Sequence, residues 1–168
     1  MATGKLTLFT GKMGAGKSTM SEVIAKRDNA VLISEDAWLS ALFPNEIQVV
    51  EDYIRRSNLI KPQMKKLAQD ILLTGTNLVL DYPANTVTQR VWLKSIFHEI
   101  GAPHELLYLK IPDQICLQQI EKRRIKHPER AATDTKEMFE IMTKYFQEPE
   151  LNEGFNVTIV TAKTIIWG

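Results

Sequence analysis

The sequence predicts an α/β protein in which helices cover a parallel β-sheet. Short apolar runs alternate along the chain with longer segments of helical period, which is the pattern of α/β proteins. Two of these runs, Val31–Ile33 and Leu78–Leu80, are continuously apolar, as in strands that are buried on both faces. A length of 168 residues is enough for one domain with its own core. We therefore expect a single domain over residues 1–168.

Five short apolar segments are the candidate strands. In chain order they are Leu6–Thr10, Ala30–Ser34, Asn77–Asp81, Glu105–Ile111 and Val157–Thr161. Between them the apolar residues recur every three or four positions, which is the period of an amphipathic helix. The alternation predicts strands that are connected by helices.

The longest helical segment covers residues 50–72, where apolar side chains recur at helical spacing. Because Pro62 cannot sit unkinked inside a helix, we expect either two helices here or one that is kinked. Gly75 follows as a C-cap before the third strand. Farther along the chain, Thr86 and Gln89 have the spacing of a capping box and predict a helix start.

The last helical segment coincides with a change in charge. Asp134 and Glu137 have capping-box spacing, so we expect a helix to open at Asp134. Its expected apolar stripe is Met138, Ile141, Met142, Tyr145 and Phe146. Residues 121–130 carry a net charge of +3, whereas residues 133–153 carry −4. Such a switch inside one domain indicates a function for the positive segment.

Composition narrows the class of protein. Lys and Arg number 21 against 20 Asp and Glu, and a net charge of +1 argues against a protein that wraps nucleic acid or ends in an acidic disordered tail. With Cys116 as the one cysteine there is no internal disulfide, which fits a reducing compartment. No stretch approaches 18 apolar residues, and the first residues lack the apolar run of a signal peptide. We expect a cytoplasmic protein without a membrane span.

The strongest functional signal is a motif of eight residues that matches G-x-x-x-x-G-K-[ST] at every position. It reads Gly11-Lys12-Met13-Gly14-Ala15-Gly16-Lys17-Ser18. It follows a predicted strand and precedes a predicted helix, which is the context of a phosphate-binding loop. Its glycines let backbone N–H groups approach phosphate oxygens, and the helix N-terminus adds partial positive charge. The alternative is a flexible glycine-rich turn, although a chance match in such a chain has a probability of about one in a hundred.

Within this loop each side chain has an expected part. Lys17 can reach the β- and γ-phosphates, and the Ser18 hydroxyl can ligate Mg²⁺. We expect the nucleotide to contact the whole segment from Gly11 to Thr19. A GTPase is not indicated, because Asp81-Tyr82-Pro83-Ala84 lacks the glycine of Asp-x-x-Gly and no Asn-Lys-x-Asp occurs. A mechanical ATPase would need more chain and a catalytic Glu after the metal-binding Asp.

From Leu6 to about Val160 the chain resembles the small P-loop kinases related to polynucleotide kinase, chloramphenicol phosphotransferase, zeta-toxin-type sugar-nucleotide kinases and gluconate kinase. The matching parts are the phosphate loop, Ile33-Ser34-Glu35-Asp36, Leu78-Val79-Leu80-Asp81, Arg90, the basic segment near Arg123 and Phe146-Gln147-Glu148-Pro149. The resemblance implies a three-layer P-loop NTPase fold whose five-stranded parallel sheet has the order 2-3-1-4-5. It also implies a short helical lid over about residues 113–133, and ATP with Mg²⁺ as the phosphoryl donor.

Two aspartates follow predicted strands and have two readings each. In the resembled kinases the Asp of a Ser-x-Asp motif orients the acceptor hydroxyl and takes its proton, and Ser34 and Asp36 match that pair. The alternative for Asp36 is a helix N-cap. Asp81 could hold the Mg²⁺ shell together with Ser18, or it could open a turn before the next proline. We expect Glu35, which lies between Ser34 and Asp36, to be exposed.

The basic segment holds the candidate lid arginines. Arg123, Arg124 and Arg130 could swing over the phosphates and bring guanidinium groups to the charge that develops in transfer. The alternative is a solvated helix face with ordinary surface pairs. Where many relatives have an arginine four residues before Arg123, this chain has Gln119, so the identity of a second lid arginine stays open.

The acceptor side is less well marked. Arg90 matches an arginine that lies near the acceptor pocket of the resembled kinases, and a surface arginine at a helix start is the alternative. Trp38, Phe43 and Tyr53 fall where such kinases build the acceptor site, although aromatic residues are more often part of the core.

These observations favour an ATP- and Mg²⁺-dependent phosphotransferase that moves a γ-phosphoryl group to an alcohol group of a small molecule. Lys17, Asp36 and Arg123 are the expected catalytic residues, with Ser18 and Asp81 at the metal. One alternative is a kinase for the 5′-hydroxyl of a polynucleotide, although the charge balance argues against a long nucleic-acid track. The other is a nucleotide-binding switch module without an acceptor.

Overall fold

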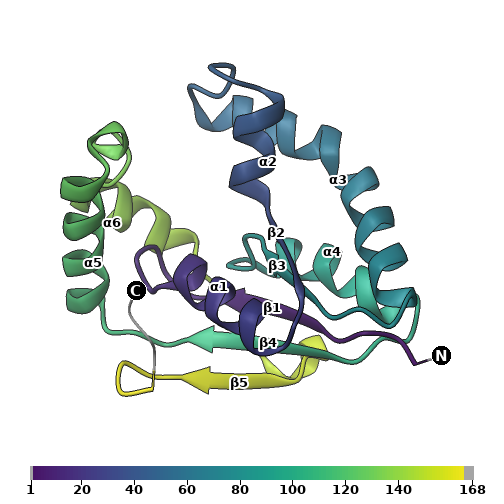
Figure 1. Ribbon diagram of the computed structural model, residues 1–168. Helices are drawn as coiled ribbons and strands as arrows, with labels where there is room; N and C mark the ends of the chain where they lie inside the picture. Colours follow the sequence, from purple (N-terminus) through teal and green to yellow (C-terminus); the bar gives the residue numbers. More distant parts are fainter. Residues whose placement is uncertain (1, 165–168) are drawn as a thin grey trace.

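The computed structural model describes residues 2–164, which form a parallel sheet of order β2-β3-β1-β4-β5 between helices (Figure 1). The strands are β1 (Leu6–Thr10), β2 (Val31–Ser34), β3 (Leu78–Asp81), β4 (His104–Leu109) and β5 (Val157–Val160). Four of the five differ by only one or two residues at their ends from the ranges that the sequence predicts, and β1 agrees at both ends. The strand order that the resemblance implies is confirmed.

Helices surround this sheet and extend beyond its carboxyl edge. They are α1 (Lys17–Arg27), α2 (Glu35–Leu42), α3 (Val50–Leu73), α4 (Val87–His98), α5 (Asp113–Lys126) and α6 (Lys136–Tyr145), with short 3₁₀ helices at η1 (Pro128–Arg130) and η2 (Leu151–Glu153). Figure 1 shows α5 and α6 beyond the arrowheads of the strands, facing α2. Within residues 2–164 no helix has both the length and the apolarity needed to cross a bilayer.

The core has two halves, one on each face of the sheet. On one face Leu6, Leu8, Leu78 and Leu80 pack against residues of α3 and α4, among them Met64, Ala68 and Leu93. On the other face Phe9, Val79 and Leu107 pack against α1, α5 and α6. Neighbouring residues of a strand therefore enter opposite halves, as the period of two requires. This burial on both faces explains the continuous apolar runs and gives the three layers.

Helix α3 differs from the expectation of a break at Pro62. The structure has one helix from Val50 to Leu73, with Ile60, Met64 and Ala68 on its buried face. Pro62 lies on the exposed face, where water can satisfy the carbonyl group that loses its intrahelical donor. The proline is therefore tolerated without ending the helix.

The predicted helix boundaries are confirmed on either side of β3. Gly75 has a φ of 86° directly after the C-cap of α3, and its N–H group donates to the Leu72 carbonyl over 3.0 Å. Thr86 caps α4, and the Thr86 and Gln89 side chains each accept a hydrogen bond from the other's backbone N–H group, as a capping box requires.

Helix α6 corrects two expectations. It begins at Lys136 with Thr135 as its N-cap, because the Thr135 hydroxyl accepts from the Met138 N–H group over 3.1 Å. Asp134 is not the cap: it is buried and is bonded to arginine side chains. Of the helix residues only Phe139 is buried, whereas the expected stripe members Ile141, Met142 and Tyr145 are exposed. The helix presents a narrower apolar face to the core than its sequence suggested.

Arg90 is a structural residue, which corrects its expected place in the acceptor pocket. Its side chain is 0% exposed, and its Nε and Nη2 atoms donate to the Glu153 carboxylate at 2.7 and 3.2 Å. Its Nη1 atom donates to the Ala84 carbonyl at 2.9 Å, and Nη2 also reaches the Glu148 carbonyl. All three nitrogen atoms of the guanidinium group are thus bound to protein groups. Arg90 joins α4 to the segment that precedes β5.

We predict that Glu153→Ala lowers the free energy of unfolding by about 3–5 kcal/mol, because it leaves the Arg90 guanidinium buried without its counter-ion. Urea denaturation followed by circular dichroism measures the loss. Glu121→Ala, at an exposed position on α5, is the control and should stay within about 0.5 kcal/mol of the parent. The double change Arg90→Met with Glu153→Leu should regain much of the stability. A Glu153→Ala variant as stable as the control would contradict the structural role.

Candidate active site

The loop from Gly11 to Gly16 joins the buried strand β1 to α1 and is built to present N–H groups. Gly14 and Gly16 have φ values of 80° and 97°, which favour glycine. Gly16 is the N-cap of α1, and no side chain among residues 2–164 bonds the first turn, which also lacks acidic residues. The N–H groups at the positive end of the helix dipole are therefore free to bind an anion.

Helix α5 lies directly against this loop at Gly14. A Cβ atom at residue 14 would lie 2.5 Å from the Cys116 carbonyl oxygen and 2.8 Å from Ile120 Cγ1, so no side chain fits there. The Lys12 ammonium adds an ion pair to Asp113 at the start of α5, with Nζ 2.8 Å from Oδ1. The loop and α5 are consequently held together at two points.

Lys17 opens α1, and its side chain turns back over the loop. Its Nζ atom donates to the carbonyl oxygens of Gly11 and, over 3.2 Å, of Lys12. Burial lowers the pKa of Lys17 to about 8, the Asp81 carboxylate opposes this shift, and the nearby Arg123 charge adds to it. The Lys17 ammonium is therefore close enough to both Asp81 and Arg123 to feel their charges.

Ser18 and Asp81 meet where the first turn of α1 approaches the end of β3. The Ser18 hydroxyl donates to Asp81 Oδ2 over 2.9 Å. Burial raises the pKa of Asp81, the bond from Ser18 works against this shift, and the charge of Asp36 adds to it. Hydroxyl and carboxylate oxygens are the ligands that Mg²⁺ prefers. Over residues 2–164 no cluster of three or more His, Cys, Asp or Glu could hold a metal ion.

Asp36 is not a helix cap, which removes the alternative reading of this residue. The cap of α2 is Ser34, whose Oγ accepts from the Ala37 N–H group over 3.3 Å. Asp36 lies within the first turn and is exposed. Because Ser34 pairs in register with Asp81 of β3, Asp36 and Asp81 emerge at the same edge of the sheet. Two carboxylates thus stand near each other beside the phosphate loop.

Glu35, expected to be exposed, is 2% exposed and links α2 to α3. It accepts hydrogen bonds from the hydroxyl groups of Tyr53 and Ser57, the latter over 2.7 Å. Burial raises the pKa of Glu35, and the two hydrogen bonds counteract part of that rise. Charged residues are seldom buried unless they are paired, and for this reason the residue type of Glu35 wrongly predicted an exposed position. The available signal was Tyr53 and Ser57 at i,i+4 spacing on one face of α3.

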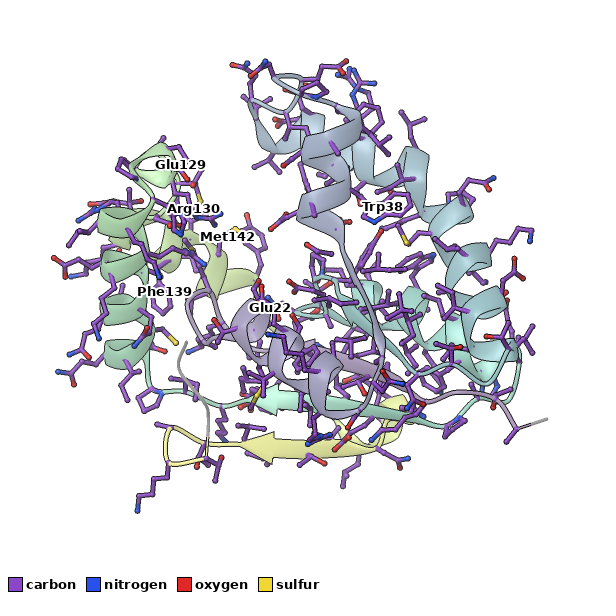
Figure 2. The ribbon with its side chains drawn as sticks, in the orientation of Figure 1. Glu22, Trp38, Glu129, Arg130, Phe139 and Met142 are labelled. Carbon is purple, nitrogen blue, oxygen red and sulfur yellow. The ribbon has the colours of Figure 1, made fainter. Side chains whose placement is uncertain are left out.

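Trp38 and Asp36 lie on different faces of α2. Trp38 follows the buried Glu35 by three residues and therefore shares its side of the helix. Its side chain is 38% exposed, and Figure 2 shows it on the side of α2 toward α3. Asp36, two residues earlier, is rotated by about 200° from it. Of the expected substrate residues, the structure therefore does not bring Trp38 and Asp36 together.

Two of the three candidate lid arginines meet at one carboxylate. Arg123 Nε and Nη2 donate to Asp134 Oδ2 and Oδ1 at 2.8 and 2.7 Å, and Arg130 Nε donates to Oδ2 at 2.9 Å. Arg124, the next residue along α5, is not among the partners of Asp134 within the described chain. Figure 2 shows Arg130 and Met142 on the side of this region that faces α2. Of the candidate arginines, Arg130 is thus the one that shares a carboxylate with Arg123.

Sequence reasoning missed Asn85, which supports the start of the phosphate loop. Its Oδ1 atom accepts from the Gly11 N–H group over 3.1 Å and from the Thr10 hydroxyl over 3.2 Å. Its carbonyl oxygen accepts from the Gln147 N–H group, so the segment that contains Phe146-Gln147-Glu148-Pro149 is fixed beside it. The sequence signal for Asn85 was an amide side chain four positions after Asp81, the last residue of β3. The segment around it looks like an ordinary turn, so this signal did not stand out.

Comparison with known proteins bears on the family and the fold of the chain. Residues 6–149 match the AAA_33 family model, which is described as an AAA domain. No curated protein sequence matches the chain significantly.

Among solved structures, the Mycobacterium tuberculosis APS kinase CysC in complex with AMPPNP and APS has a TM-score of 0.62 at 17% identity, covering 96% of this chain and 90% of its own. Kti12 from Chaetomium thermophilum in complex with ADP-AlF3 has a TM-score of 0.66 at 15% identity, over 94% and 89% of the two chains. A sugar kinase from Janibacter sp. has a TM-score of 0.62 at 16% identity, over 96% and 86%. At such identities the likeness concerns the fold. Since the family match covers most of the chain, the protein belongs to the AAA_33 family and has the fold of small P-loop kinases.

Proposed function

We propose that the protein is a kinase that transfers the γ-phosphoryl group of ATP to a hydroxyl group of a small molecule. The observation that carries this proposal is the position of Asp36. Ser34 caps α2, so the Asp36 side chain is not needed as the cap. The Asp36 carboxylate is exposed at the carboxyl edge of the sheet, near Asp81 and the phosphate loop. An exposed carboxylate beside a phosphate site suits an acceptor that must lose a proton.

The phosphate loop supplies the donor side of the reaction. The N–H groups of Gly11 and Ala15 are bound to Asn85 and Lys12, so the remaining N–H groups up to Thr19 are the ones that would surround the phosphates. The Lys17 ammonium exchanges its bonds to loop carbonyl oxygens for bonds to β- and γ-phosphate oxygens. Lys12 takes part through its backbone, since its side chain is paired with Asp113. Ser18 and Asp81 would hold Mg²⁺, which when bound neutralises charge on the phosphate oxygens.

Asp36 serves the acceptor side. Its carboxylate accepts a hydrogen bond from the acceptor hydroxyl, directs the oxygen at the γ-phosphorus and takes the proton. A bond forms between this oxygen and phosphorus while the bond to the β–γ bridging oxygen breaks, so ADP leaves with that electron pair. Arg123 and Arg130, which are held together at Asp134, supply the guanidinium groups for the charge on the transferring group. Positioning and electrostatic stabilisation supply most of the rate.

The fold alone does not separate this function from that of a nucleotide-dependent switch. APS kinase, the sugar kinase and Kti12 share it to a similar degree. A switch without an acceptor has no use for an exposed carboxylate at Asp36. This residue therefore favours phosphoryl transfer.

We predict that Lys17→Ala nearly abolishes ATP-dependent turnover, because it removes the side-chain cation of the phosphate loop. A panel of hydroxyl-bearing metabolites and antibiotics, incubated with Mg²⁺ and ATP, is analysed for phosphorylated products by mass spectrometry. Lys26→Ala, at an exposed position of the same helix, should keep the parent rate. The kinase proposal fails if the Lys17 variant turns over ATP as fast as the Lys26 variant.

Asp36→Asn should retain nucleotide affinity and reduce phosphoryl transfer by at least about a hundredfold, the usual scale for a lost general base. Calorimetry gives the affinity for a nonhydrolysable ATP analogue, and product formation gives the rate. Asp70→Asn, an exposed change on α3, is the matched control. An unchanged transfer rate in the Asp36 variant would show that another group takes the proton.

Nucleotide affinity should fall above pH 8. Below this pH Lys17 is already protonated, because burial sets its pKa at about 8. Above it the lysine is neutral in the free protein and must gain a proton when phosphate binds. From pH 7 to pH 9 the dissociation constant for ADP should therefore rise about tenfold, with uptake of about one proton at pH 9. Titration calorimetry in two buffers of different ionisation enthalpy measures this, and Lys17→Met should show no such dependence.

A further inference from the structure

We propose that Asp134 is a positioning residue for phosphoryl transfer: it fixes Arg123 and Arg130 side by side so that both guanidinium groups meet the transferring phosphate. The inference rests on the proposed kinase function and adds a residue to it. Asp134 itself touches neither nucleotide nor acceptor in this account. It acts through the two arginines that it holds.

The first ground is that the carboxylate of this cluster is buried whereas its two arginines are partly exposed. Asp134 is 1% exposed, whereas the side chains of Arg123 and Arg130 are 34% and 42% exposed. The anion is thus inside and the cations open outward. Burial would raise the pKa of Asp134, but the bonds from both arginines more than offset this and hold its pKa below the usual range. The carboxylate is therefore charged at neutral pH and keeps both arginines in place.

The second ground is which guanidinium nitrogen atoms the carboxylate uses. It takes Nε and Nη2 of Arg123 and Nε of Arg130. Within the described residues, Nη1 of Arg123 and both Nη atoms of Arg130 have no hydrogen-bond partner. Each arginine can therefore bind phosphate oxygens while its bond to Asp134 stays intact. Arg90 shows the opposite case, since all its nitrogen atoms are bound to the protein.

The third ground is the path from this cluster to the phosphate loop. Cys116, Ile120 and Arg123 follow at i, i+4 and i+7, so they share one face of α5. That face touches Gly14 of the loop through Cys116 and Ile120. In addition to the larger effect of burial, the Arg123 charge helps to lower the pKa of Lys17. Arg130 shares the Oδ2 atom of Asp134 with Arg123, so it stands beside it near the same loop.

The physical advantage is preorganisation. Two guanidinium groups repel each other, and each is carried by a long side chain whose freedom must be lost before it can bind phosphate. The carboxylate between them offsets the repulsion and removes that freedom before the nucleotide arrives. Groups that are fixed in advance stabilise a transition state without reorganising. The competing explanation is that Asp134 only anchors the turn after η1, where its N–H group donates to the Arg130 carbonyl.

The test compares two ligands on Asp134→Asn, which keeps the size of the side chain and removes its charge. Calorimetry measures the affinity for Mg·ADP and for Mg·ADP with aluminium fluoride, which imitates the phosphoryl group in transfer. We expect affinity for ADP within about twofold of the parent and at least a tenfold weaker binding of the fluoride complex. Glu129→Gln, an exposed change on η1, should bind both ligands like the parent.

A second comparison separates positioning from folding. In a protein with Arg123→Ala and Arg130→Ala, adding Asp134→Asn should not weaken the fluoride complex further, because Asp134 acts through these arginines. Asp134→Glu keeps the charge, so its affinity for the fluoride complex should lie between that of Asp134→Asn and that of the parent. If the Asn variant does not fold, Asp134→Glu is compared with the parent in its place.

Two results would overturn the inference: fluoride-complex binding by Asp134→Asn equal to that of the parent, or the same loss with and without the arginines. If the parent protein gains no affinity from aluminium fluoride, both the proposed kinase function and the inference on Asp134 are overturned.

Discussion

The contact between Gly14 and α5 is the constraint on which the rest of the site depends. Because the Cys116 carbonyl oxygen lies only 2.5 Å from where a Cβ atom of residue 14 would be, the phosphate loop and the helix that carries Arg123 meet backbone to backbone. The ion pair of Lys12 with Asp113 holds the same two elements at the base of the helix. A change in the loop would therefore move α5, and the direction of Arg123 is tied to the position of the phosphates that the loop binds.

Parallel topology brings the remaining groups together. Strands β1, β2 and β3 all end at one edge of the sheet, and each is followed by a polar residue that the site uses. Lys17 and Ser18 come after β1, Asp36 after β2 and Asp81 at the end of β3. Residues far apart in the sequence thus meet because their strands point the same way, while their helices leave in different directions.

The sequence predicted the parts of this structure that depend on local patterns. The phosphate loop, the strand positions, the glycine after α3 and the capping box of α4 each have a signal within a few residues. The strand order came only through resemblance to known kinases. Some errors arose where a local pattern misled, at Pro62 in α3 and at the start and apolar face of α6. The others concern side chains whose partners are distant: Glu35 with Ser57, and Arg90 with Glu153, 63 positions away. A charged residue can be buried only beside such a partner, and no local pattern reveals the pairing.

Neighbours in the chain can therefore have opposite roles. Glu35 and Asp36 are both acidic and adjacent, yet a helix turns each residue by about 100° from the last, so one faces α3 and the other solvent. Hydroxyl groups bind the first, and its charge serves the fold. The Asp36 carboxylate has no hydrogen-bond partner in the part of the chain that the structure describes, and it lies at the edge of the sheet near the phosphate loop. The same distinction separates Arg90 from Arg123: in each pair the chemistry available to a ligand is set by how many polar atoms the fold leaves unused.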